Sequence, residues 1–173
     1  RWLVGMVACA IDDNVQNHQL MLLHGAQGKG KSTFIRHLLP PELKDYYRNG
    51  MIIPENNNHL LQLSSCLLIN LDEFDTLSPE RMQNLKSLIT QDVVNERKVY
   101  DIQNYTYIRR ASFIASTNNP HCMPDVKENR RILFSTLLNI DYHTPVNHEG
   151  IYAQAYALYR QGFQYWYENE EIT

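Results

Sequence analysis

Short, mainly apolar runs recur along the chain, each followed by glycine or polar residues. They cover residues 20–23, 66–71 and 111–116, with a fourth candidate at 132–134. Runs of this length are typical of strands buried on both faces of a sheet. Stretches with helical spacing lie between them. We therefore expect an α/β fold, a three-layer sandwich with a mainly parallel central sheet.

Four segments are predicted to be helical. Residues 2–11 are apolar nearly all round, which indicates a buried helix. Residues 31–39 should form a helix that ends at the prolines that follow. A third helix is expected after Ser78, a good N-cap, with Pro79 at the first helical position. Residues 151–167 predict a closing helix, and its aromatic stripe is more typical of packing than of a ligand site.

In two segments, the apolar residues recur with neither helical nor strand spacing. Residues 42–59 are polar and rich in asparagine, so we interpret them as a variable excursion from the core. No function is predicted for residues 42–62. Residues 92–109 mix charged and aromatic residues irregularly, which predicts a hairpin or an extended loop.

The length of 173 residues favours a single domain, 1–173, with its closing helix in 150–173. Because the chain starts with Arg and at once reads as buried structure, we expect a fragment of a longer protein. Three cysteines without a Cys-x-x-Cys pair fit a reducing, cytoplasmic setting. No apolar run approaches the roughly 18 residues of a membrane span. The net charge of −3 means that any nucleic-acid contact must be local.

The strongest chemical motif follows the first predicted strand and matches G-x-x-x-x-G-K-[ST]. Glycines let successive backbone N–H groups point at phosphate oxygens. Lys31 would place a cation on the β- and γ-phosphates, and the Ser32 hydroxyl would ligate Mg²⁺. We therefore expect ATP and Mg²⁺ as cofactors. The predicted nucleotide-binding residues are Gly25, Ala26, Gln27, Gly28, Lys29, Gly30, Lys31, Ser32 and Thr33.

Two acids end the second predicted strand. An acid at that position, beside the phosphate loop, would hold the Mg²⁺ shell, and we assign this role to Asp72. Glu73 would then polarise the attacking water. Asp75 is the competing acid, and we interpret it as structural because it lies three residues past the strand end.

Polar residues at the end of the third strand and a later arginine pair complete the candidate catalytic set. Asn118 would lie between the acids and the γ-phosphate and orient the water; the alternative is an ordinary turn residue before a proline. Arg130 or Arg131 would stabilise transition-state charge on the phosphate, supplied in trans to a neighbouring subunit. The alternative for these arginines is a surface salt-bridge pair.

Basic and aromatic residues alternate in the segment expected to be a hairpin. This pattern suits single-stranded DNA, because cations follow the phosphates while rings stack on bases. The alternative is a solvated loop whose tyrosines pack on the sheet. The candidate nucleic-acid residues are Arg97, Lys98, Tyr100, Arg109 and Arg110.

In combination, these motifs resemble the virulence-associated protein E family, whose ATPase is similar to superfamily 3 helicases of phages and mobile elements. The specific parts are residues 27–33, 116–118 and 125–131, and residues 154–162 also look like the family's closing helix. The resemblance implies an AAA+-like fold, a ring that is often a hexamer, and action on DNA. It makes Asn118 the sensor and Arg130 or Arg131 the finger, and implies a primase-like domain upstream.

This chain departs from the family pattern at two places. Lys127 and Glu128 stand where the family tends to have Thr-Gly, and residues 97–101 differ from the family's Arg-x-Pro-Tyr-Gly. The expected function is the ATP-hydrolysing motor of a DNA helicase or primase-helicase from a mobile element. The alternatives are a ring ATPase that loads or partitions without unwinding, a small-molecule phosphotransferase, or a module that holds ATP without turnover.

Overall fold

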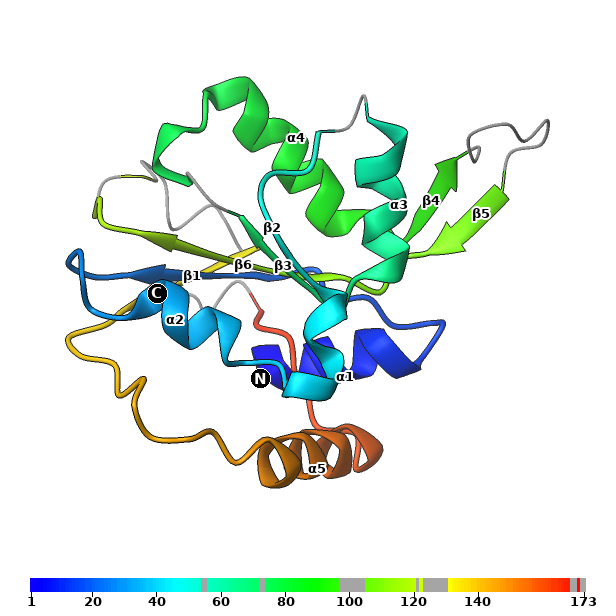
Figure 1. Ribbon diagram of the computed structural model, residues 1–173. Coiled ribbons are helices and arrows are strands. Elements are labelled where there is room, and N and C mark those ends of the chain that lie inside the picture. The colour runs from blue at the N-terminus through cyan, green and yellow to red at the C-terminus, as the bar shows by residue number, and fades with distance from the viewer. Residues whose placement is uncertain are drawn as a thin grey trace.

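A parallel sheet of five strands forms the centre of the computed structural model (Figure 1). The structure describes residues 1–53, 56–71, 74–96, 105–120, 122, 131–168 and 171. Every neighbouring pair in the sheet is parallel, as expected from the apolar runs. In sheet order the strands are β2 (Tyr47–Asn49), β3 (Leu68–Leu71), β6 (Ser112–Thr117), β1 (Leu20–His24) and β7 (Ile132–Thr136).

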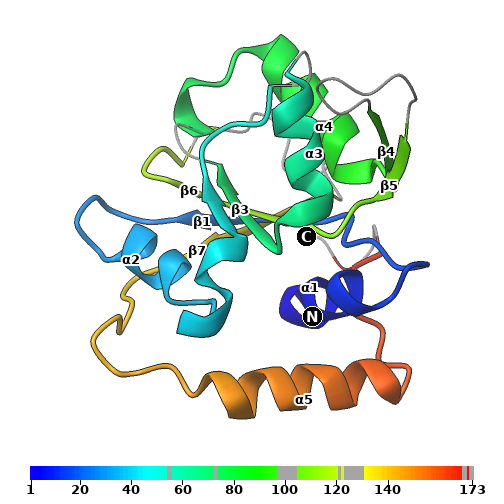
Figure 2. The same cartoon turned by 45° about the vertical axis from the view of Figure 1, so that its right-hand side comes forward.

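Helices cover both faces of the sheet, which confirms the layered α/β expectation. The helices α3 (Asn57–Ser65) and α4 (Pro79–Thr90) lie on one face, whereas α1 (Trp2–Ile11) and α2 (Lys31–Arg36) lie on the other (Figures 1 and 2). The last helix, α5 (His148–Arg160), packs on the outer side of α1. In the described part of the chain, no helix combines the length and apolarity that a membrane crossing requires.

Successive residues along the strands pack into two separate hydrophobic clusters, one on each face of the sheet. Leu22 and Phe113 join the cluster beneath α3 and α4, while their neighbours Leu23 and Ile114 join the cluster with α1 and α2. This alternation follows from the period of two along a strand. Burying each such side chain contributes about 1.5–3 kcal/mol to the free energy of folding. Packing on both faces therefore stabilises the sheet whose edge carries the candidate site.

The start of α4 agrees with the predicted capping. Ser78 is the N-cap, and its hydroxyl accepts a hydrogen bond from the Arg81 N–H at 3.3 Å. Pro79 occupies the first turn, where its missing N–H costs nothing.

The excursion at 42–59 contains more regular structure than its polar sequence predicts. A 3₁₀ helix at Pro41–Tyr46 leads into β2, an edge strand of the main sheet. The helix α3 then begins after Asn56, whose side chain accepts from the N–H groups of Asn58 and His59. The three residues of β2 carry no apolar pattern that would predict a strand. They are a strand because they pair with β3.

The closing helix is shorter than predicted, and the expected end at residue 167 is wrong. It ends at Arg160 because Gly162 adopts a left-handed conformation with φ of 76°. Backbone bonds from Gly162 N to Tyr159 O and from Phe163 N to Leu158 O close the end. This is the Schellman arrangement, which stops a helix at a glycine.

The predicted hairpin is present and lies outside the main sheet. The strands β4 (Val93–Glu96) and β5 (Tyr105–Ile108) pair antiparallel and project from one end of the molecule (Figure 1).

Candidate functional site

The candidate site lies at the carboxyl edge of the sheet, where β1 runs into the glycine-rich loop and α2 follows. Gly28 and Gly30 have φ of 78° and 81°, in the left-handed region that favours glycine. The sequence motif thus sits between a strand and a helix, the context in which such a loop cradles phosphate.

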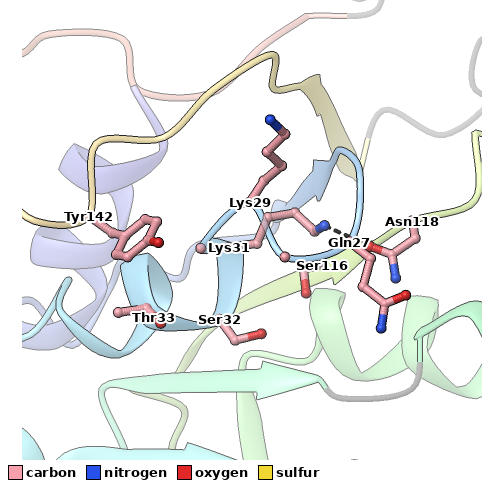
Figure 3. Close-up of a pocket in the computed structure, with 10 residues that line it drawn as sticks. Gln27, Lys29, Lys31, Ser32, Thr33, Ser116, Asn118 and Tyr142 are labelled. Carbon is pink, nitrogen blue, oxygen red and sulfur yellow. Dashed lines mark hydrogen bonds between the residues drawn. The ribbon is translucent and has the colours of Figure 1, made fainter.

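The loop forms one wall of a cavity of about 460 Å³ (Figure 3). Residues from the end of β6 and from the segment after β7 complete the lining. The lining residues are Gln27, Gly28, Lys29, Gly30, Lys31, Ser32, Thr33, Ser116, Asn118 and Tyr142. Of the nine predicted nucleotide-binding residues, the seven from Gln27 to Thr33 are therefore brought together at one cavity.

Lys31 is the buried cation of this cavity, with 7% of its surface exposed. Its Nζ donates to Gly25 O at 2.6 Å, Ala26 O at 2.9 Å and Asn118 Oδ1 at 2.7 Å. Burial lowers the pKa of Lys31, and the negative charge of Asp75 acts in the opposite direction. Among the residues that the structure describes, no carboxylate contacts this ammonium, so it suits an anionic ligand.

Asn118 lies where the strand-end pattern predicts. Its strand, β6, stands between β1 and β3, so the amide sits between the phosphate loop and the end of the strand that precedes Asp72. Besides accepting from Lys31, Asn118 donates its backbone N–H to Asp75 Oδ2 at 3.3 Å. The Thr117 hydroxyl donates to the other oxygen of Asp75.

Asp75 is therefore part of the site, although its sequence position suggested a structural role. A short 3₁₀ helix, Phe74–Thr76, carries it back to the end of β6. The sequence offered one signal for this role: Asp75 is the third carboxylate within four residues of the end of β3. What the sequence does not reveal is that the chain turns there instead of leaving the sheet.

Tyr142 is the second residue that sequence reasoning missed. It comes from the segment between β7 and α5, and its ring packs on the phosphate loop at Gly30. A Cβ at Gly30 would lie 2.0 Å from Tyr142 Cδ1, so only glycine fits beneath the ring. No local motif marks this tyrosine, because its contact joins residues far apart in sequence.

Several predicted residues lie outside the described part of the chain. They are Asp72, Glu73, Arg97, Lys98, Tyr100 and Arg130. Arg131 is described: it directly precedes β7, and its carbonyl accepts from Leu20 N at 2.7 Å. It therefore lies at the amino edge of the sheet, opposite the phosphate loop of its own chain.

The prediction that Arg109 contacts nucleic acid is wrong. Its side chain is fully buried, with 0% exposure. The guanidinium donates to four backbone carbonyls, those of Gln91, Ala111, Asn17 and Ile89. No N–H direction remains open to solvent, and its role is structural.

Arg110 is more exposed than its neighbour but is also engaged. It forms an ion pair with Asp13 and donates to Cys9 O at 3.4 Å, at the carboxyl end of α1. These contacts hold the Arg110 side chain against the end of α1.

The fold and the site can be compared with known proteins. A family model described as the virulence-associated protein E-like domain matches residues 1–173. No curated protein matches the chain significantly. Solved structures of the NrS-1 C-terminal region do match: an A-form apo structure has a TM-score of 0.56 at 16% identity, covering 99% of this chain and 41% of that one. Another apo structure of the region gives 0.57 at 13% identity, with 99% and 43% covered. This likeness shows the fold, and the chain spans about two fifths of those chains.

Proposed function

The chain belongs to the virulence-associated protein E-like domain family, and from that premise we propose that it binds ATP with Mg²⁺ and hydrolyses the nucleotide. In this proposal the domain is an AAA+-like P-loop ATPase. The observation that carries it is the cavity at the carboxyl edge of a parallel sheet, with the buried Lys31 ammonium aimed into a glycine-rich loop. Ligands of α/β proteins bind at this edge.

The lining residues suit a nucleotide phosphate chain. Backbone N–H groups of the loop and the Lys31 ammonium are the donors that phosphate oxygens take. In binding, Lys31 exchanges its bonds to Gly25 O and Ala26 O for bonds to phosphate oxygens. The release of those two carbonyls couples ligand binding to the shape of the loop.

The residues at the cavity also suit a divalent cation beside the phosphates. Mg²⁺ takes oxygen ligands and is bound through one or two protein groups plus phosphate oxygens. The Ser32 hydroxyl lines the cavity, and Asp72 directly follows β3, which is separated from β1 by β6 alone. We assign both to the ion, which would neutralise charge on the phosphates, and we assign the polarisation of water to Glu73.

Asn118 is assigned the sensor role in this scheme. It contacts Lys31 on one side and is held by Asp75 on the other, so a change at the γ-phosphate would reach β6 through one hydrogen-bond chain. An orienting amide at this point places the water without itself exchanging a proton.

The biological role proposed is the motor of a DNA helicase or primase-helicase from a mobile element. Family membership supports this role, together with the hairpin β4–β5 that projects from the body. Arg97 and Lys98 are assigned to single-stranded DNA, with Tyr100 stacking on bases. A homo-oligomeric ring, a hexamer by family resemblance, would bring these hairpins together in one pore.

The test is steady-state ATP hydrolysis as a function of protein concentration, with and without single-stranded DNA. The rate per subunit should rise with both concentration and DNA. Lys31→Ala and Glu73→Gln should each lower the rate by at least about 100-fold, because phosphate positioning and water activation are lost. A rate unaffected by both variants would contradict the site, and a rate independent of concentration and DNA would contradict the DNA motor.

A strand-displacement assay distinguishes unwinding from loading or partition. A ring that hydrolyses ATP in response to DNA but separates no strands would be a loader or a partition motor. Both roles use the same cavity.

A further inference from the structure

The cavity has two chemically different ends. Figure 3 shows Asn118 and Gln27 together with the Lys31 amine at one end, and Tyr142 beside Thr33 at the other. The first end gathers groups that suit an anion. The second end is lined by the aromatic ring of Tyr142. A ligand that fills both ends must itself be charged at one end and flat or apolar at the other.

The ring is held in place by a built turn. Asp141 Oδ1 accepts from the N–H groups of His143 and Thr144, each at 3.1 Å. Its other oxygen accepts from the Thr144 hydroxyl at 2.6 Å. These bonds fix the backbone on both sides of Tyr142, so little ordering remains to be done when a ligand arrives.

The segment that carries the ring is also fixed at both ends. Leu137 N donates to His24 O at 2.7 Å, at the end of β1. Past the ring, the His148 side chain lies 2.7 Å from His37 O, and the Tyr152 hydroxyl donates to Leu38 O at 3.0 Å. The segment therefore runs from the phosphate-loop strand to the far end of α2, with Tyr142 between.

We propose that Tyr142 is the nucleoside-contacting residue of the site: its ring packs against the base and ribose of a bound nucleoside triphosphate. This inference rests on the proposed nucleotide binding. With the γ-phosphate between Lys31 and Asn118, a triphosphate lying along the loop extends toward Thr33 and carries its nucleoside to Tyr142. The ring recognises a nucleoside through its flat apolar surface, a contact that inorganic triphosphate lacks.

The test compares two ligands that share the phosphate half. The affinities of Mg·ATP and of Mg·tripolyphosphate are measured by titration calorimetry for the wild type, Tyr142→Ala and Tyr142→Phe. Tyr142→Ala should weaken ATP binding by about 5- to 100-fold, the range for losing one base–aromatic contact. Its affinity for tripolyphosphate should stay unchanged, and Tyr142→Phe should bind both ligands like the wild type. The matched control is Tyr156→Ala, an exposed tyrosine on α5 that does not line the cavity.

Each other outcome overturns the inference in a recognisable way. If Tyr142→Ala binds ATP as tightly as the wild type, the ring makes no nucleoside contact. If it binds ATP more tightly, the ring occupies the nucleotide's place. If it loses ATP and tripolyphosphate equally, the ring only shapes the phosphate loop. If the wild type binds neither ligand, the proposed nucleotide binding itself fails.

Discussion

At the residue scale, the polar end of the cavity is a chain of hydrogen bonds with a defined direction. Lys31 donates to the side chain of Asn118, whose backbone N–H donates to Asp75. Asp75 does not itself line the cavity, but it contacts Asn118, which does. It is therefore a positioning residue that acts through Asn118, with a second anchor at the Thr117 hydroxyl.

Asn118→Ala and Asp75→Ala should therefore lower kcat for the same reason. Hydrogen bonds to a charged group are worth about 1.5–3 kcal/mol, so each variant should lose about 10- to 100-fold in kcat. Because Asp75 acts by positioning the residue whose side chain Asn118→Ala removes, the double variant should be no slower than the slower single one. Steady-state kinetics gives the kcat values, and thermal melts confirm that the variants fold.

Additive losses in that cycle would show that Asp75 has its own contact with the reaction. A change in KM alone would instead place Asp75 in ground-state binding. Lys86→Ala on α4 is a suitable control, because Lys86 is a charged residue that does not line the cavity.

At the element scale, the sequence predicts what local pattern decides. The strands β1, β3 and β6 were predicted because each lies in a mainly apolar run, and the start of α4 because Ser78 and Pro79 form a local cap. The strand β2 was missed because only its pairing with β3 makes it a strand. The phosphate loop was predictable because it is a local motif. The positions of Tyr142 and Asp75 in the site depend instead on how loops distant in sequence return to the sheet.

Arg109 shows how a charged residue can belong to the packing between elements. It stands at the junction of β5 and β6. Its four carbonyl partners lie in the loop before β1, at the end of α4 and directly before β6. Its guanidinium also lies over the Phe113 ring, 5.8 Å from the centroid. One side chain thus ties the root of the hairpin to the core.

Arg109→Met should lower the free energy of unfolding by at least about 3 kcal/mol, because each buried carbonyl left without a donor costs about 1–3 kcal/mol. The neighbouring Arg110→Met is the matched control. It removes a partly exposed ion pair with Asp13, so the loss should stay at about 0–1 kcal/mol. Urea denaturation measures both. Equal losses in the two variants would contradict the structural role assigned to Arg109.

At the scale of the whole molecule, the phosphate loop and Arg131 lie at opposite edges of one sheet. Arg131 directly precedes the strand β7, and the last residue of that strand, Thr136, pairs with His24 at the start of the loop. Five strand residues span about 16 Å. An arginine side chain cannot cover that distance, so Arg131 does not reach the phosphates of its own chain. If Arg131 is catalytic, as the sequence motifs predict, it must therefore act on the nucleotide of a neighbouring subunit.

Mixing two inactive variants tests this arrangement. Lys31→Ala keeps the arginines but loses the phosphate loop's cation, whereas Arg130→Ala/Arg131→Ala keeps the loop but loses the arginines. In a randomly mixed ring with equal amounts of both, about one interface in four pairs an intact loop with an intact arginine. ATP hydrolysis should then recover to about a quarter of the wild-type rate, although each variant alone is inactive. Recovery requires that a complete site be built from two chains, because no single chain in the mixture carries both parts. A mixture as inactive as its components, under conditions where sedimentation shows mixed assemblies, would mean that the arginines act within their own subunit or not in catalysis at all.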